Sequence, residues 1–268
     1  MRAYWRTCGH RHGNFGDELT RLIVEHVLGA KVDRAAEMDD ADLISIGSIL
    51  GEIPWSFQGC VWGAGAMFDE SVIDLPNAWI CAVRGPLSAR RVVQGAPVAL
   101  GDPGLLAGRA LAWTLPRRRY ELSIVPHYVD MDDPALAMWV RRNPWVHVID
   151  PCGPVDEVVE QIAGSAAVLS SSLHGLIVAD AFGVPNRWVK FGDRLAGGTF
   201  KFRDYYAAFG IFDPIPMQLP EGRPPSQIIA GCQVVPRDEV ERVCDGLLDA
   251  FPHGASVDRA PLGEWVLR

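Results

Sequence analysis

The residues with the clearest capacity for chemistry form one short cluster: Ser170, Ser171, Ser172 and His174. They stand between the apolar run 166–169 and LIVADAFG, whose apolar residues have helical spacing before the stop Gly-Val-Pro. This order predicts a strand, a tight turn and the start of a helix. Ligands of open α/β sheets bind at such strand ends, and the free N–H groups of a helix start attract anions. Alternatively, the serines only cap the helix and His174 is an ordinary turn residue.

Other polar residues also follow apolar runs. Asn14 and Asp17 lie in the glycine-rich loop after the first run, Arg84 follows AWICAV, and Asp102 follows VALG. If these runs are parallel strands of one sheet, their carboxyl ends meet at the same edge. Each side chain has a structural alternative. Asp17 and Asn14 can shape the next helix start, Arg84 can pair with Asp102, and Asp102 can be a turn residue.

The order of apolar runs predicts an α/β fold with parallel sheets. Runs typical of buried strands are 3–8, 42–46, 59–62, 78–83, 98–100, 122–126, 146–149, 166–169 and 186–189. Stretches with helical features are 17–28, 86–93, 133–142, 154–163, 176–183 and 237–251. This alternation predicts two Rossmann-like, doubly wound units. The first glycine-rich loop is not G-x-G-x-x-G, so dinucleotide binding is unsupported.

A change of character at 107–119 indicates a linker, because LAWTLPRRRY combines a proline with several arginines. The prediction is an N-terminal domain over 1–115, a C-terminal domain over 116–236, and a helix and tail over 237–268 that pack back on the first domain. The two domains should face a cleft. The run Arg117-Arg118-Arg119 is either a solvated linker or a contact for a phosphorylated or lipid-linked substrate.

Composition limits the classes of function. The 268 residues are 49% apolar and 22% charged, as in globular proteins that bury a sizeable core. A formal net charge of −8 disfavours nonspecific binding to nucleic acid. The chain has no apolar run of about 18 residues to span a membrane and no apolar leader at its start, so a cytoplasmic location is expected.

The cysteines do not predict a metal site. None of the six belongs to a C-x-x-C pair, and most lie in or beside apolar runs, so we expect buried, reduced thiols. Cys8 stands close to His10 and His12, but no second ligand pair follows at zinc-site spacing. We therefore expect no metal.

Several short motifs, in order along the chain, carry a family resemblance. They are GNFGDELT (13–20), RGPLSAR (84–90), GDPGLL (101–106), SSSLHGLIVADAFGVP (170–185) and KFRDYY (201–206). With them the chain resembles the polysaccharide pyruvyl transferase family over roughly residues 13–206. One position departs, because many members carry Arg where this chain has Ser172. The donor's charge must then be met elsewhere, or the donor differs.

The resemblance implies a glycosyltransferase-B-like arrangement and a defined reaction. A pyruvyl group passes from phosphoenolpyruvate to two hydroxyls of one sugar and forms a cyclic ketal. The donor needs cations and N–H groups, its methylene carbon needs an acid, and the sugar hydroxyls need a base. No cofactor is required. The implied acceptor is a sugar of a cell-surface or exopolysaccharide, free or lipid-linked, met in the cytoplasm or at the inner membrane.

The resemblance and the strand-end positions together suggest roles for individual residues. His174 is the expected acid and Asp17 the expected base. The expected donor-binding residues are Arg84, Ser170, Ser171, Ser172, Lys201 and Arg203. Among them Arg84 matches the Arg of the family's R-[GD]-P-x-S motif, while Lys201 and Arg203 would supply the charge that Ser172 lacks or lie in a solvated loop. Asn14 and Asp102 are expected on the acceptor side.

Two other functions stay open at this point. A nucleotide-sugar-dependent glycosyltransferase of the same architecture would normally carry an acidic ribose-binding pattern late in its second domain, and none is evident here. A noncatalytic sugar-binding scaffold is the third possibility, and the presence of Asp17, Arg84 and His174 weighs against it.

Overall fold

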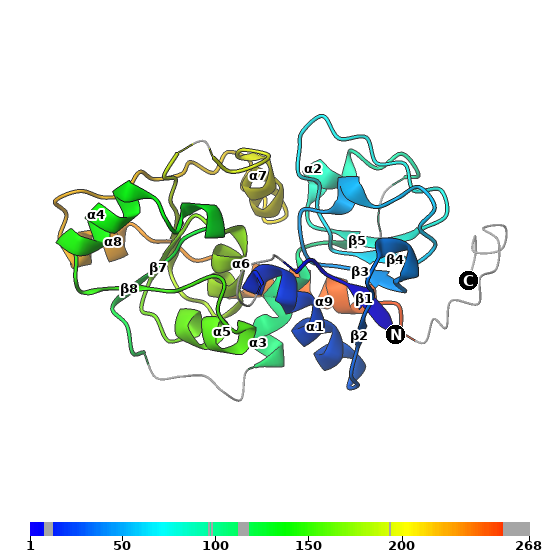
Figure 1. Cartoon of the computed structure of the whole chain (residues 1–268), viewed down its shortest axis with the longest axis horizontal. Helices are drawn as coiled ribbons and strands as arrows, with labels where there is room; N and C mark the ends of the chain where they lie inside the picture. Colours follow the sequence, from blue (N-terminus) through cyan, green and yellow to red (C-terminus); the bar gives the residue numbers. More distant parts are fainter. Residues whose placement is uncertain (8–12, 96, 98, 112–117, 193, 254–268) are drawn as a thin grey trace.

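The computed structural model describes residues 1–7, 13–95, 97, 99–111, 118–192 and 194–253. Within them the chain forms two parallel sheets with helices packed around each, so the predicted α/β class is confirmed. Figure 1 shows the sheets side by side, the first (blue to cyan) on the right and the second (green to yellow) on the left. Parallel strands need crossover connections, and helices supply most of them.

The first sheet has the strand order β2-β1-β3-β4-β5-β6. Its strands are β1 (Arg2–Tyr4), β2 (Asp33–Arg34), β3 (Leu43–Ile44), β4 (Cys60–Trp62), β5 (Trp79–Val83) and β6 (Ala99–Leu100). All three residues of β4 are buried, which explains why its sequence is continuously apolar rather than alternating. The segments after β5 and β6 begin with Arg84 and Gly101, so Arg84 and Asp102 come from neighbouring strand ends.

The second sheet has the order β10-β9-β7-β8. Its strands are β7 (Leu122–Val125), β8 (Val146–Val148), β9 (Val168–Ser170) and β10 (Asn186–Trp188). Ser170 pairs with Val125 on one side and Trp188 on the other. The carboxyl ends of β7, β9 and β10 therefore meet at one edge, as the sequence predicts for the serine cluster.

Helices connect and cover these strands. They are α1 (Phe15–Leu28), α2 (Pro86–Ala89), α3 (Ala107–Ala110), α4 (Pro134–Arg142), α5 (Val155–Ala163), α6 (Leu173–Ala181), α7 (Phe200–Ala207), α8 (Pro225–Ala230) and α9 (Arg237–Asp249). Short 3-10 turns include η3 (Pro103–Leu106) and η5 (Tyr128–Asp130). The sequence dictates the ends of α1: Asn14 accepts the N–H of Gly16, and Gly29 closes the helix at φ 64°.

Helix α6 is the centre of the molecule, because every one of its residues is buried. It is apolar around its whole circumference, as expected of a helix with neighbours on all sides. Leu176 and Ile177 of α6 share one core cluster with Leu19 and Ile23 of α1. The helix that carries His174 thus packs against elements that belong to both sheets.

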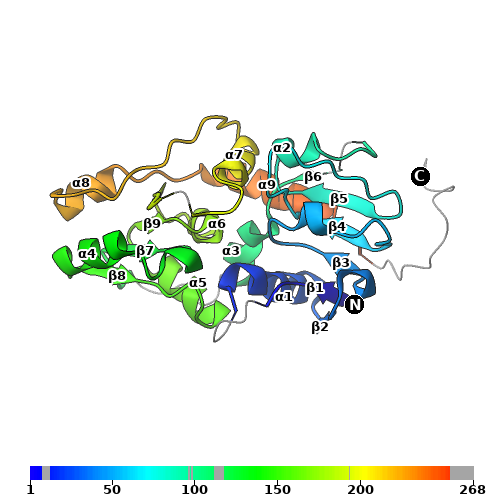
Figure 2. The same cartoon turned by 45° about the horizontal axis from the view of Figure 1, so that its top comes forward.

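The last helix, α9, returns to the first sheet. The indole Nε1 of Trp62 in β4 donates to the backbone oxygen of Leu247 at 2.8 Å, and the ring of Phe251 packs edge-on against it. Arg109 in α3 pairs with Asp245 at 2.7 Å and also with Glu241. Figure 2 shows α9 (orange) beside β6.

Some predicted elements differ in the structure. The strand predicted over 3–8 is β1, which ends at Tyr4, and the helix predicted over 86–93 is α2, which ends at Ala89. The interpretation of Lys201 and Arg203 as parts of a solvated loop is wrong, because both lie in α7. That helix escapes a periodicity search because it is buried on several faces and has no clear polar side.

Several sequence-based expectations stay predictions. The proposed boundary at 115/116 and the candidate ligands Cys8, His10 and His12 lie outside the described residues, as do Arg117 and the tail from 254 onward. The glycosyltransferase-B-like arrangement is likewise a prediction. Among the described helices, none is both long and apolar enough to cross a membrane.

The packing of α9 predicts a large effect of truncating Leu247, which is fully buried. Leu247→Ala should lower the free energy of unfolding by about 2–5 kcal/mol, because it leaves a cavity against the first sheet. Urea denaturation would measure this. Asp249→Ala, on the exposed face of the same helix, is the control and should change stability by less than about 0.5 kcal/mol. Equal effects of the two variants would contradict this packing.

Candidate functional site

His174 is the second residue of α6, and its imidazole is enclosed by elements of both halves. On one side lies the start of α1, where a Cβ added to Gly16 would sit 2.0 Å from His174 Nδ1. On the other side Nε2 lies 3.9 Å from Oδ2 of Asp102. The ring of Phe15 stands perpendicular to the imidazole at 6.5 Å. Only glycine at position 16 therefore leaves room for this ring.

Asp102 and His174 each keep one buried polar atom without a hydrogen-bond partner within the described chain: Oδ2 of Asp102 and Nε2 of His174. The other oxygen of Asp102 accepts the N–H of Gly104 at 2.9 Å and caps η3. Burial raises the pKa of Asp102 to about 6. Burial and the nearby charges of Lys201 and Arg84 lower the pKa of His174 to about 3. These shifts favour a neutral imidazole at neutral pH in the free protein.

Lys201 reaches the same region from α7 and is only 7% exposed. Within the described part of the chain no carboxylate forms an ion pair with its ammonium, and Nζ lies 5.5 Å from the centroid of the Phe202 ring. Burial and the neighbouring Arg84 lower the pKa of Lys201 to about 8, against the opposing pull of Asp17 and Asp130. A buried cation without a partner is costly, and an anionic ligand would remove that cost.

Asp17 lies in the first turn of α1, beside this group. Its Oδ2 accepts from Asn14 Nδ2 at 3.3 Å, while Asn14 Oδ1 is the helix cap. Burial raises the pKa of Asp17 to about 6. The capping role weighed for Asp17 thus belongs to Asn14, which also holds the Asp17 carboxyl in place.

Arg84 is completely buried and bonded to protein through all three of its guanidinium nitrogens. Nε donates to Asp204 Oδ2 at 3.0 Å, Nη1 to Ser48 Oγ at 2.7 Å, and Nη2 to the backbone oxygen of Ala66 at 2.7 Å. Asp204 also accepts the N–H of Ser88 at 2.8 Å. The salt-bridge partner is therefore Asp204 of α7 and not Asp102, the partner considered from the sequence.

The serine cluster is occupied mainly by internal bonds. Ser170 Oγ bonds to the backbone oxygens of Val125 at 2.8 Å and Ser172 at 2.7 Å. Ser171 Oγ donates to Asp130 Oδ2 at 2.7 Å and accepts the N–H of His127 at 2.8 Å. Ser172 stands at the N-cap of α6, but its side chain makes no capping bond.

The structure thus brings together most of the residues predicted from sequence. Asp17, Asp102, His174 and Lys201 share one buried region, and Arg84 lies within electrostatic reach of it. Arg203 is partly exposed on α7 and takes no part in these contacts. The donor, acceptor and catalytic roles assigned to all of these residues stay predictions.

Sequence reasoning missed four residues of this region, which are Gly16, His127, Asp130 and Asp204. The position of His127 directly after the predicted strand 122–126 was a usable signal. Asp204 lies within the motif KFRDYY, but no local pattern links it to Arg84, because that contact joins positions far apart in the chain.

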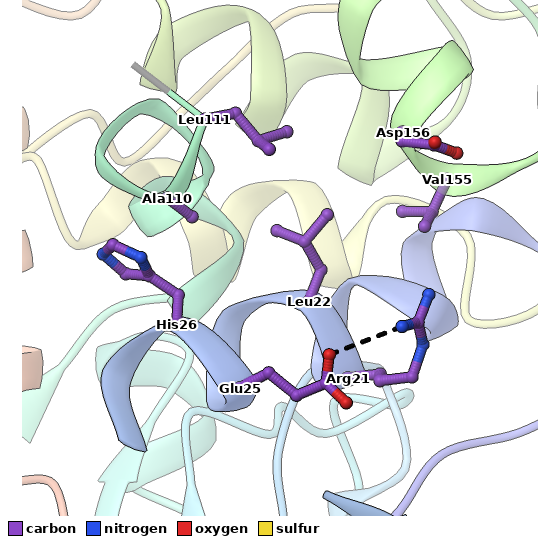
Figure 3. A pocket seen from close by; sticks show the side chains of 8 residues that line it. All are labelled: Arg21, Leu22, Glu25, His26, Ala110, Leu111, Val155 and Asp156. Carbon is purple, nitrogen blue, oxygen red and sulfur yellow. Dashed lines mark hydrogen bonds and ion pairs between the residues drawn. The ribbon is translucent and has the colours of Figure 1, made fainter. Parts of the chain in front are cut away.

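A separate pocket lies away from this region, between α1, α3 and α5 (Figure 3). Its volume is about 410 Å³, with Leu22, Leu111 and Val155 on its apolar side. Arg21 and Glu25 on its rim approach each other at 3.4 Å. None of the residues predicted to bind or react lines it. Among the described residues, no group of three His, Cys, Asp or Glu side chains is arranged to hold a metal.

Comparison with known proteins shows which family part of the chain resembles. Residues 75–191 match the family model described as polysaccharide pyruvyl transferase. The resemblance to this family is confirmed. The match contains Arg84, Asp102, His127 and His174, whereas Lys201 lies just beyond it and Asp17 well before it.

Two curated proteins are similar to this chain. Succinoglycan biosynthesis protein ExoV of Rhizobium meliloti (strain 1021) is 28% identical over 215 residues, which is 78% of this chain and 64% of ExoV. Uncharacterized protein L143 of Acanthamoeba polyphaga mimivirus is 37% identical over 119 residues, or 42% of this chain and 41% of L143. The chain thus matches somewhat less than two thirds of the length of ExoV and less than half of L143.

All three guanidinium nitrogens of Arg84 are bonded to protein, so this side chain holds the end of β5 and α7 together. Arg84→Lys should lower the free energy of unfolding by about 3 kcal/mol, because one ammonium cannot serve Asp204, Ser48 and Ala66 together. Chemical denaturation would measure the loss. Arg242→Lys is the matched control, since its pair with Glu239 is exposed and should matter little. A variant of normal stability that loses donor affinity would instead support direct contact between Arg84 and the donor.

Proposed function

We propose that this protein transfers a pyruvyl group from phosphoenolpyruvate to two hydroxyls of a sugar and forms a cyclic ketal. The observation that carries the proposal is Lys201, a buried ammonium without a carboxylate partner in the described chain, in the same region as His174. A small, strongly anionic donor fits such a site. The family match supports pyruvyl transfer as the reaction.

The donor's negative groups would be held mainly from α6 and α7. Lys201 supplies a full charge, and the first N–H groups of α6 supply oriented dipoles. This arrangement accounts for Ser172, because a cation from α7 replaces the Arg that many family members carry in the serine motif. Arg203 and the serine cluster stay candidates for further contacts, and Arg84 acts by holding α7 through Asp204.

Proton transfer would begin at the pair formed by His174 and Asp102. The methylene carbon of phosphoenolpyruvate must gain a proton while the bond to phosphate breaks and the sugar oxygens attack. A bound dianion favours the imidazolium form of His174 and opposes the two cations that now depress its pKa. The Asp102 carboxyl, whose Oδ2 lies 3.9 Å from Nε2, would exchange the proton with the imidazole. Asp17, whose pKa burial raises to about 6, is suited to accept a hydroxyl proton at neutral pH.

The proposed acceptor is based on the name of one relative, ExoV. ExoV is named for succinoglycan biosynthesis, so we propose a sugar of an exopolysaccharide or cell-surface polysaccharide, free or as a lipid-linked precursor. A glycosyltransferase-B-like pair of domains, no cofactor and a cytoplasmic location, with or without peripheral contact at the inner membrane, complete the proposal. The competing function is a nucleotide-sugar-dependent glycosyltransferase.

The donor class can be tested by thermal stabilisation. Phosphoenolpyruvate should raise the Tm of the free protein, and the shift should grow with its concentration because the ligand binds only the folded state. UDP-sugars and GDP-sugars serve as comparison ligands. A clear shift with a nucleotide-sugar and none with phosphoenolpyruvate would reject pyruvyl transfer.

Lys201→Met gives the same experiment a sharper form. The variant should be at least as stable as the natural protein without ligand, because it removes an unpaired buried charge, yet it should lose most of the shift with phosphoenolpyruvate. In the natural protein the affinity should fall as the pH rises through about 8, where Lys201 loses its proton, and this dependence should vanish in the variant. Lys31→Met, at an exposed lysine with no proposed role, is the control.

His174→Asn tests the proton-transfer step. Turnover should fall by about 10²–10⁴ while donor binding falls only modestly, because asparagine keeps a polar group but cannot deliver a proton. Steady-state rates at saturating phosphoenolpyruvate would show this. His174→Gln should not rescue the rate. Recovery of most of the rate at saturating donor would limit His174 to binding and leave Asp102 or Asp17 as the proton donor.

A further inference from the structure

His127 is a second histidine beside the proposed donor site, and its backbone is fixed there by the strand-end turn. It follows β7 after Pro126 and donates its N–H to Ser171 Oγ at 2.8 Å. Ser171 in turn donates to Asp130 at 2.7 Å. Because β7 and β9 are paired neighbours, this network places His127 at the sheet edge from which α6 begins.

The hydrogen bonds of the His127 ring define which nitrogen carries the proton. Nδ1 accepts the N–H of Val129 at 3.3 Å, so the neutral ring carries its proton on Nε2. The ring also packs against Tyr128, with centroids 4.5 Å apart. Adding a proton at Nδ1 would set two N–H donors against each other. The geometry therefore keeps His127 neutral, with a single N–H available at Nε2.

The surroundings of His127 support the same state. Burial, together with the charge of Lys201 in α7, lowers the pKa of His127 to about 3, and His127 in turn acts electrostatically on His174 in α6. Unlike His174, whose Nε2 is sealed within the protein, His127 is only partly buried. His127 therefore offers a neutral N–H within electrostatic reach of Lys201 without adding a second positive charge.

We propose that His127 binds the donor by giving its Nε2–H to an oxygen of the anion that Lys201 attracts. This inference rests on the proposed function and adds a residue that the motif-based reading of the sequence does not contain. A neutral N–H suits the position, because a second full cation next to Lys201 would repel it whenever the site is empty. His127 then contributes to donor affinity and not to proton delivery.

Two substitutions separate hydrogen bonding from acid chemistry. His127→Phe keeps a ring to pack on Tyr128 but has no N–H, so it should weaken phosphoenolpyruvate binding by about ten- to a hundredfold, the usual weight of a hydrogen bond to a charged group. His127→Gln keeps an N–H donor and should retain most of the affinity. Both should leave kcat at saturating donor nearly unchanged. His147→Phe is the matched control, since His147 of β8 stacks on Tyr120 elsewhere.

Calorimetric titration with phosphoenolpyruvate and steady-state kinetics would decide the matter, with Tm confirming that each variant folds. If folded His127→Phe binds phosphoenolpyruvate as tightly as the natural protein does, the proposed role of His127 is wrong, whereas the proposed function is unaffected. A fall of kcat in both variants with KM unchanged would overturn the neutral-donor role in favour of proton transfer. If the natural protein binds no phosphoenolpyruvate, the proposed function fails, and the role of His127 fails with it.

Discussion

The buried ion pair between Arg84 and Asp204 is the interaction on which the rest of the arrangement depends. It joins the end of β5 in the first sheet to α7, which follows the last strand of the second. A guanidinium without contact with water must have its N–H groups met by protein, and here all three nitrogens are. A Cβ at Gly85 would lie 2.0 Å from the backbone oxygen of Asp204, so the close approach also needs glycine.

This satisfied pair explains why nearby groups can stay unsatisfied. With α7 held against the first sheet, Lys201 is carried into the interior without a carboxylate partner in the described chain. The buried α6 likewise holds His174 against Asp102, although neither Nε2 nor Oδ2 has a hydrogen-bond partner among the described residues. Such groups cost stability in the free protein, and a ligand of the right charge would recover that cost. The contrast between satisfied and unsatisfied polar groups is what marks this region as a site.

The histidines of the region show how position alone separates chemical roles. His174 is wedged between Gly16 and Asp102, with its Nε2 buried 3.9 Å from the Asp102 carboxyl. His127 has one nitrogen occupied by Val129 and remains partly exposed. The first is suited to exchanging a proton with a carboxyl group, and the second to offering one neutral N–H.

The sequence by itself determined the fold class, most strand ends and the resemblance to a family. Continuous apolar runs indicate buried parallel strands, and the ordered motifs carry the resemblance to the pyruvyl transferase family, whose model matches residues 75–191. These features are local, so a single stretch of chain contains the whole signal. The positions of Asp17, Asp102 and His174 beside strand or helix ends are predictable for the same reason.

Only the tertiary structure decided which side chains pair with one another. Arg84 binds Asp204 rather than Asp102 because α7 folds over the end of β5, a contact between residues 120 positions apart. The helical state of 200–207 depends on burial on several faces, which leaves no periodic pattern to read. The tautomer of His127 and the isolation of Lys201 likewise follow from neighbours brought together by packing. Sequence patterns report which residues can react, whereas burial and charge pairing depend on distances that only the folded chain sets.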